Sequence, residues 1–174
     1  SVRKFTGDPL PLTAATQLLW AGQGITSRSG LRTAPSAGAL YPLLLYLVAG
    51  RINELEAGVY RYHPREHGLE SVLSGDLLDR LCADALGQGA IRKSAFCLVI
   101  TAFYERTTGK YGRRGIQYVH LDAGHAAQNI CLQAVALDLG TVPIGAFHDE
   151  RVQSTLRLAA DETPLYILPV GKYR

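Results

Sequence analysis

The chain has 174 residues, of which 47% are hydrophobic and 19% charged, and its formal net charge is +3. These proportions are typical of one globular unit, so we predict a single domain over residues 1–174. The charge is too small to indicate nucleic-acid binding, and no apolar run approaches the roughly 20 residues of a membrane span.

The cysteines and the N-terminal segment bear on the compartment. Cys82, Cys97 and Cys131 are odd in number and lie among apolar residues. We therefore expect reduced thiols rather than disulfides or metal ligands. The segment SVRKFTGDP lacks the apolar stretch of a signal peptide, and the sequence predicts a cytoplasmic protein.

The first half of the chain predicts one helix and three strands. Residues 12–24 have helical apolar spacing and end in glycine. Residues 43–49 form a near-continuous apolar run, which predicts a strand covered on both faces. Residues 58–63 alternate as a strand does, and a turn leads to a short return strand over residues 69–73.

The middle of the chain predicts two helices, a strand and a loop. We expect a helix over residues 77–86, an apolar strand over 96–104 and a loop over 105–115. A long helix should follow over residues 116–139, with apolar or small residues nearly all round. Such a helix needs cover on most sides, so we expect a partner subunit to bury it.

The last part should hold an extended segment over residues 141–147, an amphipathic helix over 148–159 and a strand over 164–171. Strands and helices are mixed without regular alternation of strand and crossover helix. The sequence therefore predicts the α+β class.

Three segments of small residues accompany three basic segments. The small segments are PSAG at 35–38, VPIGAF at 142–147 and PVGK at 169–172. The basic ones are SVRKF, GKYGRRG and GKYR. Each alone is typical of a turn or a solvated charge, but together they suit a flat, anionic cofactor, because bare backbone approaches a ring and cations hold a phosphate. The glycine patterns of P-loops and dinucleotide folds are missing.

The order and spacing of several motifs resemble a known family. The motifs are SxRxF, RTAPSAGALYP, GVYRYxP, KYGxRG, GHAAQN and VPIGAF. Over essentially the whole chain they are similar to the nitroreductase-like flavoproteins, and more closely to the SagB/ThcOx-type dehydrogenases. The resemblance implies a central antiparallel or mixed sheet flanked by helices, an intertwined homodimer, and FMN in a cleft between the subunits.

The resemblance also implies roles for individual residues. Ser1 and Arg3 would reach the phosphate and the N1/O2 edge of the flavin, and Gln88 would face its pyrimidine end. A further set would contact the ring or the phosphate: Pro35, Ser36, Ala37 and Gly38 against the ring, Pro143, Ile144, Gly145 and Ala146 with backbone N–H groups toward N5 and O4, and Lys172 and Arg174 on the phosphate.

Lys110 and Tyr111 match a Lys-Tyr pair that removes a proton in the azoline-oxidising members of the family. To act as a base near neutral pH, Lys110 must be uncharged. Burial and the neighbouring Arg113 and Arg114 favour the uncharged form, whereas a flavin phosphate opposes it. The alternative is a solvated basic loop, and the sequence leaves the two open.

Three functions follow as hypotheses. The first is an FMN-dependent dehydrogenase that oxidises azolines to azoles in a peptide or small molecule. The second is an NAD(P)H-dependent reductase of nitroaromatics or quinones, for which Lys110 should hardly matter. The third is a flavin-binding dimer without turnover. None of them involves nucleic acid or a membrane.

Two other sites are disfavoured by their spacing. His120, Asp122 and His125 suggest a metal, but residues 120 and 122 point about 200° apart on a helix, and we predict no metal site. Ser36 lacks the G-x-S-x-G elbow of a nucleophilic serine.

Overall fold

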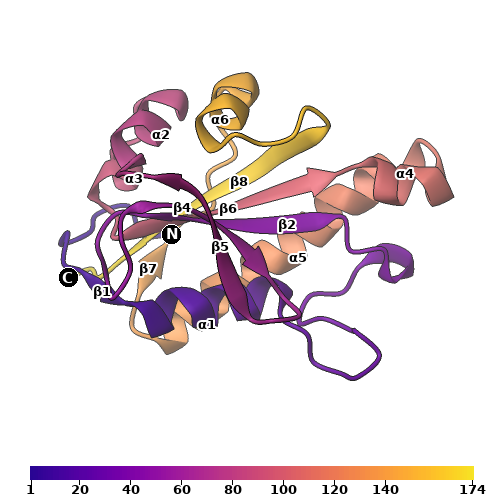
Figure 1. Cartoon of the computed structure of the whole chain (residues 1–174), viewed down its shortest axis with the longest axis horizontal. Helices are drawn as coiled ribbons and strands as arrows, with labels where there is room; N and C mark the ends of the chain where they lie inside the picture. Colours follow the sequence, from indigo (N-terminus) through magenta and orange to yellow (C-terminus); the bar gives the residue numbers. More distant parts are fainter.

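A six-stranded antiparallel sheet with helices on both faces forms the centre of the protein in the computed structural model, which describes residues 1–174 (Figure 1). The strand order is β5-β4-β2-β6-β8-β7. The strands are β2 (Leu43–Ala49), β4 (Gly58–His63), β5 (Gly68–Ser74), β6 (Phe96–Phe103), β7 (Gly140–Thr141) and β8 (Glu162–Gly171). A two-stranded parallel pair, β1 (Leu10–Pro11) with β3 (Ile52–Asn53), lies outside it. The predicted α+β class is confirmed.

Alternation along β2 divides the core between the two faces of the sheet. Successive side chains of a strand point to opposite faces. Leu45 packs in a core with α1 (Leu12–Gln23) and α5 (Arg114–Ala136). Tyr46 packs in a second core with α2 (Leu78–Asp84), α3 (Gly89–Lys93) and α6 (Asp149–Leu156). Both faces of β2 are thus covered, as its apolar run predicts.

One predicted loop is wrong. Residues 105–111 form the helix α4 (Glu105–Tyr111), which leads directly into α5. The segment has two threonines, a glycine and no apolar stripe, so its own sequence does not favour a helix. Tertiary contact decides instead: a Cβ on Gly115 would lie 2.9 Å from the backbone of Thr107 and Thr108, so α4 rests directly on the start of α5.

The cysteines are free, as expected. Cys82 and Cys97 are buried and Cys131 is half-buried. Burial raises the pKa of the Cys97 thiol to about 12, which keeps it protonated and unreactive. None of the helices combines the length and the apolar character that crossing a bilayer requires.

Candidate functional site

The N-terminal arm lies against the edge of the sheet formed by β7 and β8. The backbone N–H of Val2 donates to the carbonyl of Thr141, and that of Thr6 donates to the carbonyl of Lys172, each at 3.0 Å. A Cβ on Gly171 would lie 2.9 Å from the ring of Phe5. The arm therefore packs closely only because residue 171 is glycine. This packing places Arg3 beside the C-terminal strand.

A hollow of about 530 Å³ opens next to this arm. It is lined by Arg3, Lys4, Phe5, Gln88, Gly89, Ala90, Lys93 and Ile144. Three of these side chains are cationic, and no carboxylate lies within 4.0 Å of them. The combination of unpaired cations and bare glycine backbone fits an anionic group with a flat ring. Lys4 belongs to the basic segment SVRKF, whereas Lys93 was not predicted from the sequence, because it lies in no motif.

The VPIGAF segment lies extended beside β8. Ile144 exchanges two backbone hydrogen bonds with Ile167, at 2.8 and 3.0 Å, and its side chain is buried in the second core. The Ile144 N–H is therefore already used, which corrects its expected role as a donor to a flavin. The exposed residues Gly145 and Ala146 remain the candidates.

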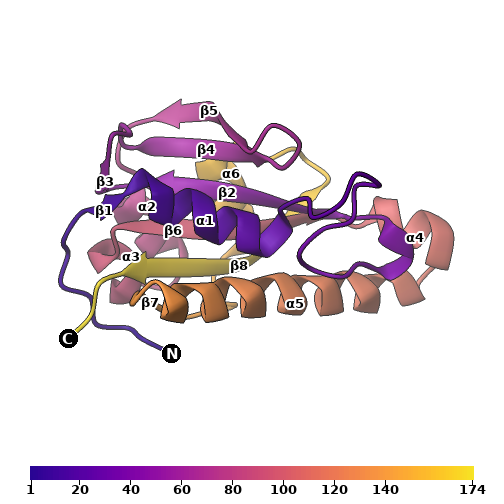
Figure 2. The same ribbon diagram turned by 90° about the horizontal axis from the view of Figure 1, so that it is seen from below.

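The side chain of Gln88 bonds the VPIGAF segment. Its side-chain Nε2 donates to the carbonyl of Ala146 at 2.9 Å. Exposed Ser1, Lys172 and Arg174 lie at the same end of the molecule, where the two termini run side by side (Figure 2). The structure thus gathers one group of predicted residues here, which we call the arm end: Ser1, Arg3, Gln88, Pro143, Ile144, Gly145, Ala146, Lys172 and Arg174.

The PSAG segment forms a tight loop at the other end of the molecule. Gly38 has φ +63°, and Ala39 and Tyr41 also have positive φ, a conformation that L-residues rarely adopt. The Ser36 hydroxyl accepts the N–H of Tyr41 at 3.0 Å. The loop is therefore held by specific polar contacts against its local preference.

Asp122 of α5 holds the same loop in place through hydrogen bonds. Its Oδ1 accepts the N–H of Ala37 at 3.4 Å, and its side chain also bonds Ser36. Asp122 is 5% exposed, and its Oδ2 has no partner. Burial raises the pKa of this carboxyl, while the bonds from Ser36 and Ala37 partly offset the rise. The sequence suggested Asp122 only as a weak metal ligand.

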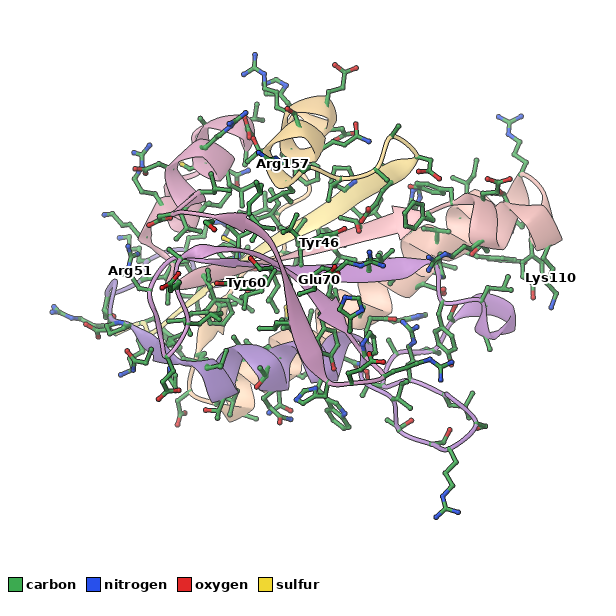
Figure 3. The ribbon with its side chains drawn as sticks, in the orientation of Figure 1. Tyr46, Arg51, Tyr60, Glu70, Lys110 and Arg157 are labelled. Atoms are coloured by element: carbon green, nitrogen blue, oxygen red, sulfur yellow. The ribbon has the colours of Figure 1, made fainter.

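Lys110 and Tyr111 lie directly against Gly38. A Cβ there would be 2.7 Å from the Tyr111 hydroxyl and 3.1 Å from the Lys110 Nζ. The Tyr111 ring packs edge-on against Tyr118, with centroids 5.1 Å apart. Lys110 is exposed at the tip of α4 (Figure 3), so the burial expected to favour its uncharged form is missing in a single chain. We call Pro35 to Gly38 with Lys110 and Tyr111 the loop end.

The two ends are far apart within one chain. α5 runs from the loop end to the arm end and has 23 residues, or roughly 35 Å at 1.5 Å per residue (Figure 2). The two sets of predicted residues therefore lie at separate places along α5 within one subunit.

The helix α5 does not assemble a metal site. His120 hydrogen-bonds the hydroxyl of Tyr104 through Nε2 at 2.5 Å, while Asp122 faces the PSAG loop. Asn129 donates to the carbonyl of Thr33 at 3.1 Å. No group of three His, Cys, Asp or Glu side chains could hold a metal ion.

Residues 1–172 match the nitroreductase family. The chain belongs to the nitroreductase family. A protein of Methanocaldococcus jannaschii, MJ1384, assigned by name to the nitroreductases, is 42% identical over 99% of this chain and 86% of its own length. The family and its structural neighbours make this chain a nitroreductase-family oxidoreductase, and members of the family typically bind flavin.

Relatives in peptide-toxin systems are also similar. The trifolitoxin operon protein TfxC of Rhizobium leguminosarum is 27% identical over 98% of this chain, which spans 52% of TfxC. In the solved microcin synthetase McbBCD complex of Escherichia coli with truncated pro-MccB17 bound, one chain superposes with a TM-score of 0.86 at 26% identity, over all of this chain and 70% of that one.

A nitroreductase structure from Anabaena variabilis superposes with a TM-score of 0.88 at 29% identity. That superposition covers all of this chain and 36% of the Anabaena chain. The chain therefore spans about a third to a half of some of the proteins that it resembles.

Proposed function

We propose that this protein is an FMN-dependent dehydrogenase that oxidises azolines to azoles in peptides. The observation that carries the proposal is the contact of Lys110 and Tyr111 with Gly38 of the PSAG loop. A proton acceptor thereby lies at the loop that the resemblance assigns to the flavin ring. The similarity to TfxC and to a chain of the McbBCD complex favours a peptide substrate.

The site would be composite, formed by the arm end of one subunit and the loop end of another. Asp122, which contacts the loop, lies 14 residues, or roughly 21 Å, before the end of α5, so we expect a second copy to bring both ends to one flavin. Leu121, Leu132 and Val135 of α5 are 50 to 68% exposed and lie within about 60° of one another on the helix. This apolar stripe is the dimer face that we propose.

At the arm end, Arg3, Lys172 and Arg174 would hold the phosphate, with Lys4 and Lys93 adding charge at the same hollow. Gln88 fixes the carbonyl of Ala146 and so fixes the backbone beside it. The N–H groups of Gly145 and Ala146 can then face the ring without reorganising.

When bound, the flavin supplies a two-electron acceptor at N5. Lys110 would accept the proton that leaves the azoline ring as its hydride departs, so that the ring loses one hydride and one proton and becomes an azole. The Tyr111 hydroxyl, at the same Gly38, would orient the ring. Lys110 must be uncharged for this role, so the second subunit and the substrate must cover it.

A second candidate is an NAD(P)H-dependent reductase of nitroaromatics or quinones. The exposure of Lys110 and the 42% identity to a protein assigned as a nitroreductase favour it. A flavin-binding dimer without turnover is the third candidate, and tight FMN binding without acceleration by any hydride donor would identify it.

The test begins with the FMN-loaded protein, kept free of oxygen. Addition of a thiazoline peptide should bleach the flavin absorbance in wild type, and Lys110→Ala should slow that bleaching by about a hundredfold or more, the range of a lost general base. Fast bleaching by NADH or NADPH that Lys110→Ala leaves unchanged would establish the reductase instead. Arg80→Ala, an equal loss of charge at an exposed position on α2, is the matched control.

A further inference from the structure

The sheet opens into a wedge where β2 and β4 separate. Their pairing extends only from Ala49↔Gly58 to Tyr46↔Arg61, whereas β2 continues to Leu43 with β6 as its neighbour. A hollow of about 110 Å³ lies in this gap. Leu43, Leu44 and Leu45 of β2 line it along the stretch where β2 is not paired with β4.

Cationic side chains line this wedge. They are Arg32, Arg61 and Arg106, from the loop before β2, from β4 and from α4, and His63 of β4 lies beside them. Three arginines that line one small hollow concentrate positive charge there, which favours an anionic ligand. We call this hollow and its lining the arginine wedge.

Arg32 and Arg106 are held in place by neutral groups. The Nη1 of Arg32 donates to the side-chain oxygen of Gln23 at 2.7 Å, and its guanidinium lies 4.5 Å above the ring of Tyr41. The Nη1 of Arg106 donates to the carbonyl of Tyr41 at 3.3 Å. The two guanidinium groups are therefore positioned by the fold without being neutralised.

None of the arginines in the wedge has a carboxylate partner. The ion pairs of the structure are His63–Glu70 and Arg92–Asp79, so no carboxylate lies within 4.0 Å of Arg32, Arg61 or Arg106. Burial lowers the pKa of Arg32, Tyr41 partly offsets this, and Arg106 lowers it further. An arriving anion would relieve this unfavourable arrangement.

A larger hollow adjoins the wedge and gives room for the rest of a ligand. It measures about 480 Å³ and shares Arg32, His63 and Pro64 with the wedge. Ile25, Leu31 and Tyr41 line it, together with polar groups. The adjoining hollow gives room for the body of an organic acid whose charged end lies in the wedge, whereas an inorganic anion would leave that room unused.

We propose that the arginine wedge binds the carboxylate of a peptide substrate. Arg106 and Lys110 are four residues apart on α4 and share one face, about 6 Å apart along the axis. A carboxylate held by Arg106 would thus anchor the peptide one helical turn from the candidate base. The binding itself does not depend on the reaction, but its role in substrate selection rests on the proposed function.

Calorimetric titration measures the affinity of the wedge for three short peptides, each blocked at its N-terminus. One carries a single Glu and a C-terminal amide, one a free C-terminal carboxylate without Glu, and the third is fully neutral, with Gln for Glu. We expect one of the first two to bind and the neutral peptide to bind at least about tenfold more weakly. The stronger of the two identifies the source of the carboxylate. Equal binding of all three would overturn the proposal.

Arginine variants separate the wedge from diffuse charge. Arg106→Gln should weaken binding of the acidic peptide about tenfold, because it removes one charged hydrogen-bond donor. Arg32→Gln should do the same, and exposed Arg106 keeps the test valid if loss of Arg32 disturbs the fold. Arg80→Gln, an equal charge loss at an exposed position on α2, is the control, and an equal effect there would overturn the proposal.

The same titrations are made with and without FMN. Carboxylate binding without azoline oxidation would leave the wedge standing and remove only the proposed reaction. Inorganic phosphate is titrated in competition with the acidic peptide. If phosphate displaces the peptide and binds as tightly as the peptide does, the assignment to an organic acid is overturned.

Discussion

Asp122 shows at the scale of single residues how the PSAG loop is held. It is a buried carboxylate whose Oδ1 accepts a backbone N–H of the loop, while Oδ2 has no partner. The loop contains three residues with positive φ, Gly38, Ala39 and Tyr41. Such a conformation persists only when the surroundings impose it, and Asp122 with Ser36 provides that constraint.

The raised pKa of Asp122 predicts a pH dependence of stability. Because the folded pKa lies above the unfolded one, the protonated carboxyl favours the folded state at low pH. This contribution is present below the unfolded pKa and is lost as the pH rises through the folded pKa. Asp122→Asn keeps an acceptor for Ala37 but does not titrate, so it should lack this loss.

Urea unfolding of wild type and Asp122→Asn, over mildly acidic to neutral pH, measures how the stability of each depends on pH. The free energy of unfolding of wild type, relative to Asp122→Asn, should fall as the pH rises. Parallel curves would mean that Asp122 has the same pKa in both states. Asp8→Asn, at an exposed carboxyl of the arm, serves as the control.

Single residues were also where the sequence was least informative. The candidate base and the glycine of PSAG are more than 70 positions apart, and only the packing of α4 on the loop brings them together. Lys93 and Asp122 belong to no motif that a single sequence reveals. The motifs point to candidate residues, but spacing along the chain does not place them at two separate ends.

At the scale of elements, prediction worked where burial alone decides. The apolar runs of β2 and β6 and the long helix α5 are core elements, and their patterns indicate them directly. Helix α4 was missed because contact with α5 at Gly115, rather than its own sequence, stabilises it. The helix predicted over 77–86 ends early at Asp84, and α3 follows after Gly87.

The packing of the N-terminal arm on β8 predicts a selective effect on cofactor binding. In Gly171→Ala the new Cβ would lie 2.9 Å from the Phe5 ring, and the arm must move outward with Arg3. Overpacking of this kind costs about 1–3 kcal/mol. Because the arm carries Arg3, we expect FMN affinity to fall by about tenfold, while outward movement of the arm relieves the clash and limits the fall in melting temperature to a few degrees.

Fluorescence titration with FMN measures that affinity. Gly68→Ala is the matched control, since its Cβ would meet nothing closer than 3.7 Å. An unchanged FMN affinity in Gly171→Ala would show that the arm does not position the phosphate site.

At the scale of the whole molecule, the two candidate half-sites lie at opposite ends of α5 (Figure 2). The exposed apolar stripe of Leu121, Leu132 and Val135 lies on the same helix. A twofold dimer through this stripe would run two copies of α5 past each other, so that each arm end meets the loop end of the other copy. The symmetry of the proposed dimer thus follows from the position of the half-sites.

A heterodimer of two inactive variants tests this arrangement. Arg3→Glu places a negative charge where the phosphate would bind, and Gly38→Val forces a branched side chain into a position with φ +63° and 2.7 Å from the Tyr111 hydroxyl. Each homodimer should be inactive. Co-expressed with different tags and purified as the heterodimer, the pair should regain about half of the wild-type activity, because one of its two sites has both halves intact. A subunit carrying both changes, paired with wild type, leaves neither site intact and should be inactive. If each site instead lay within one chain, that second heterodimer would retain half of the activity and the first would have none.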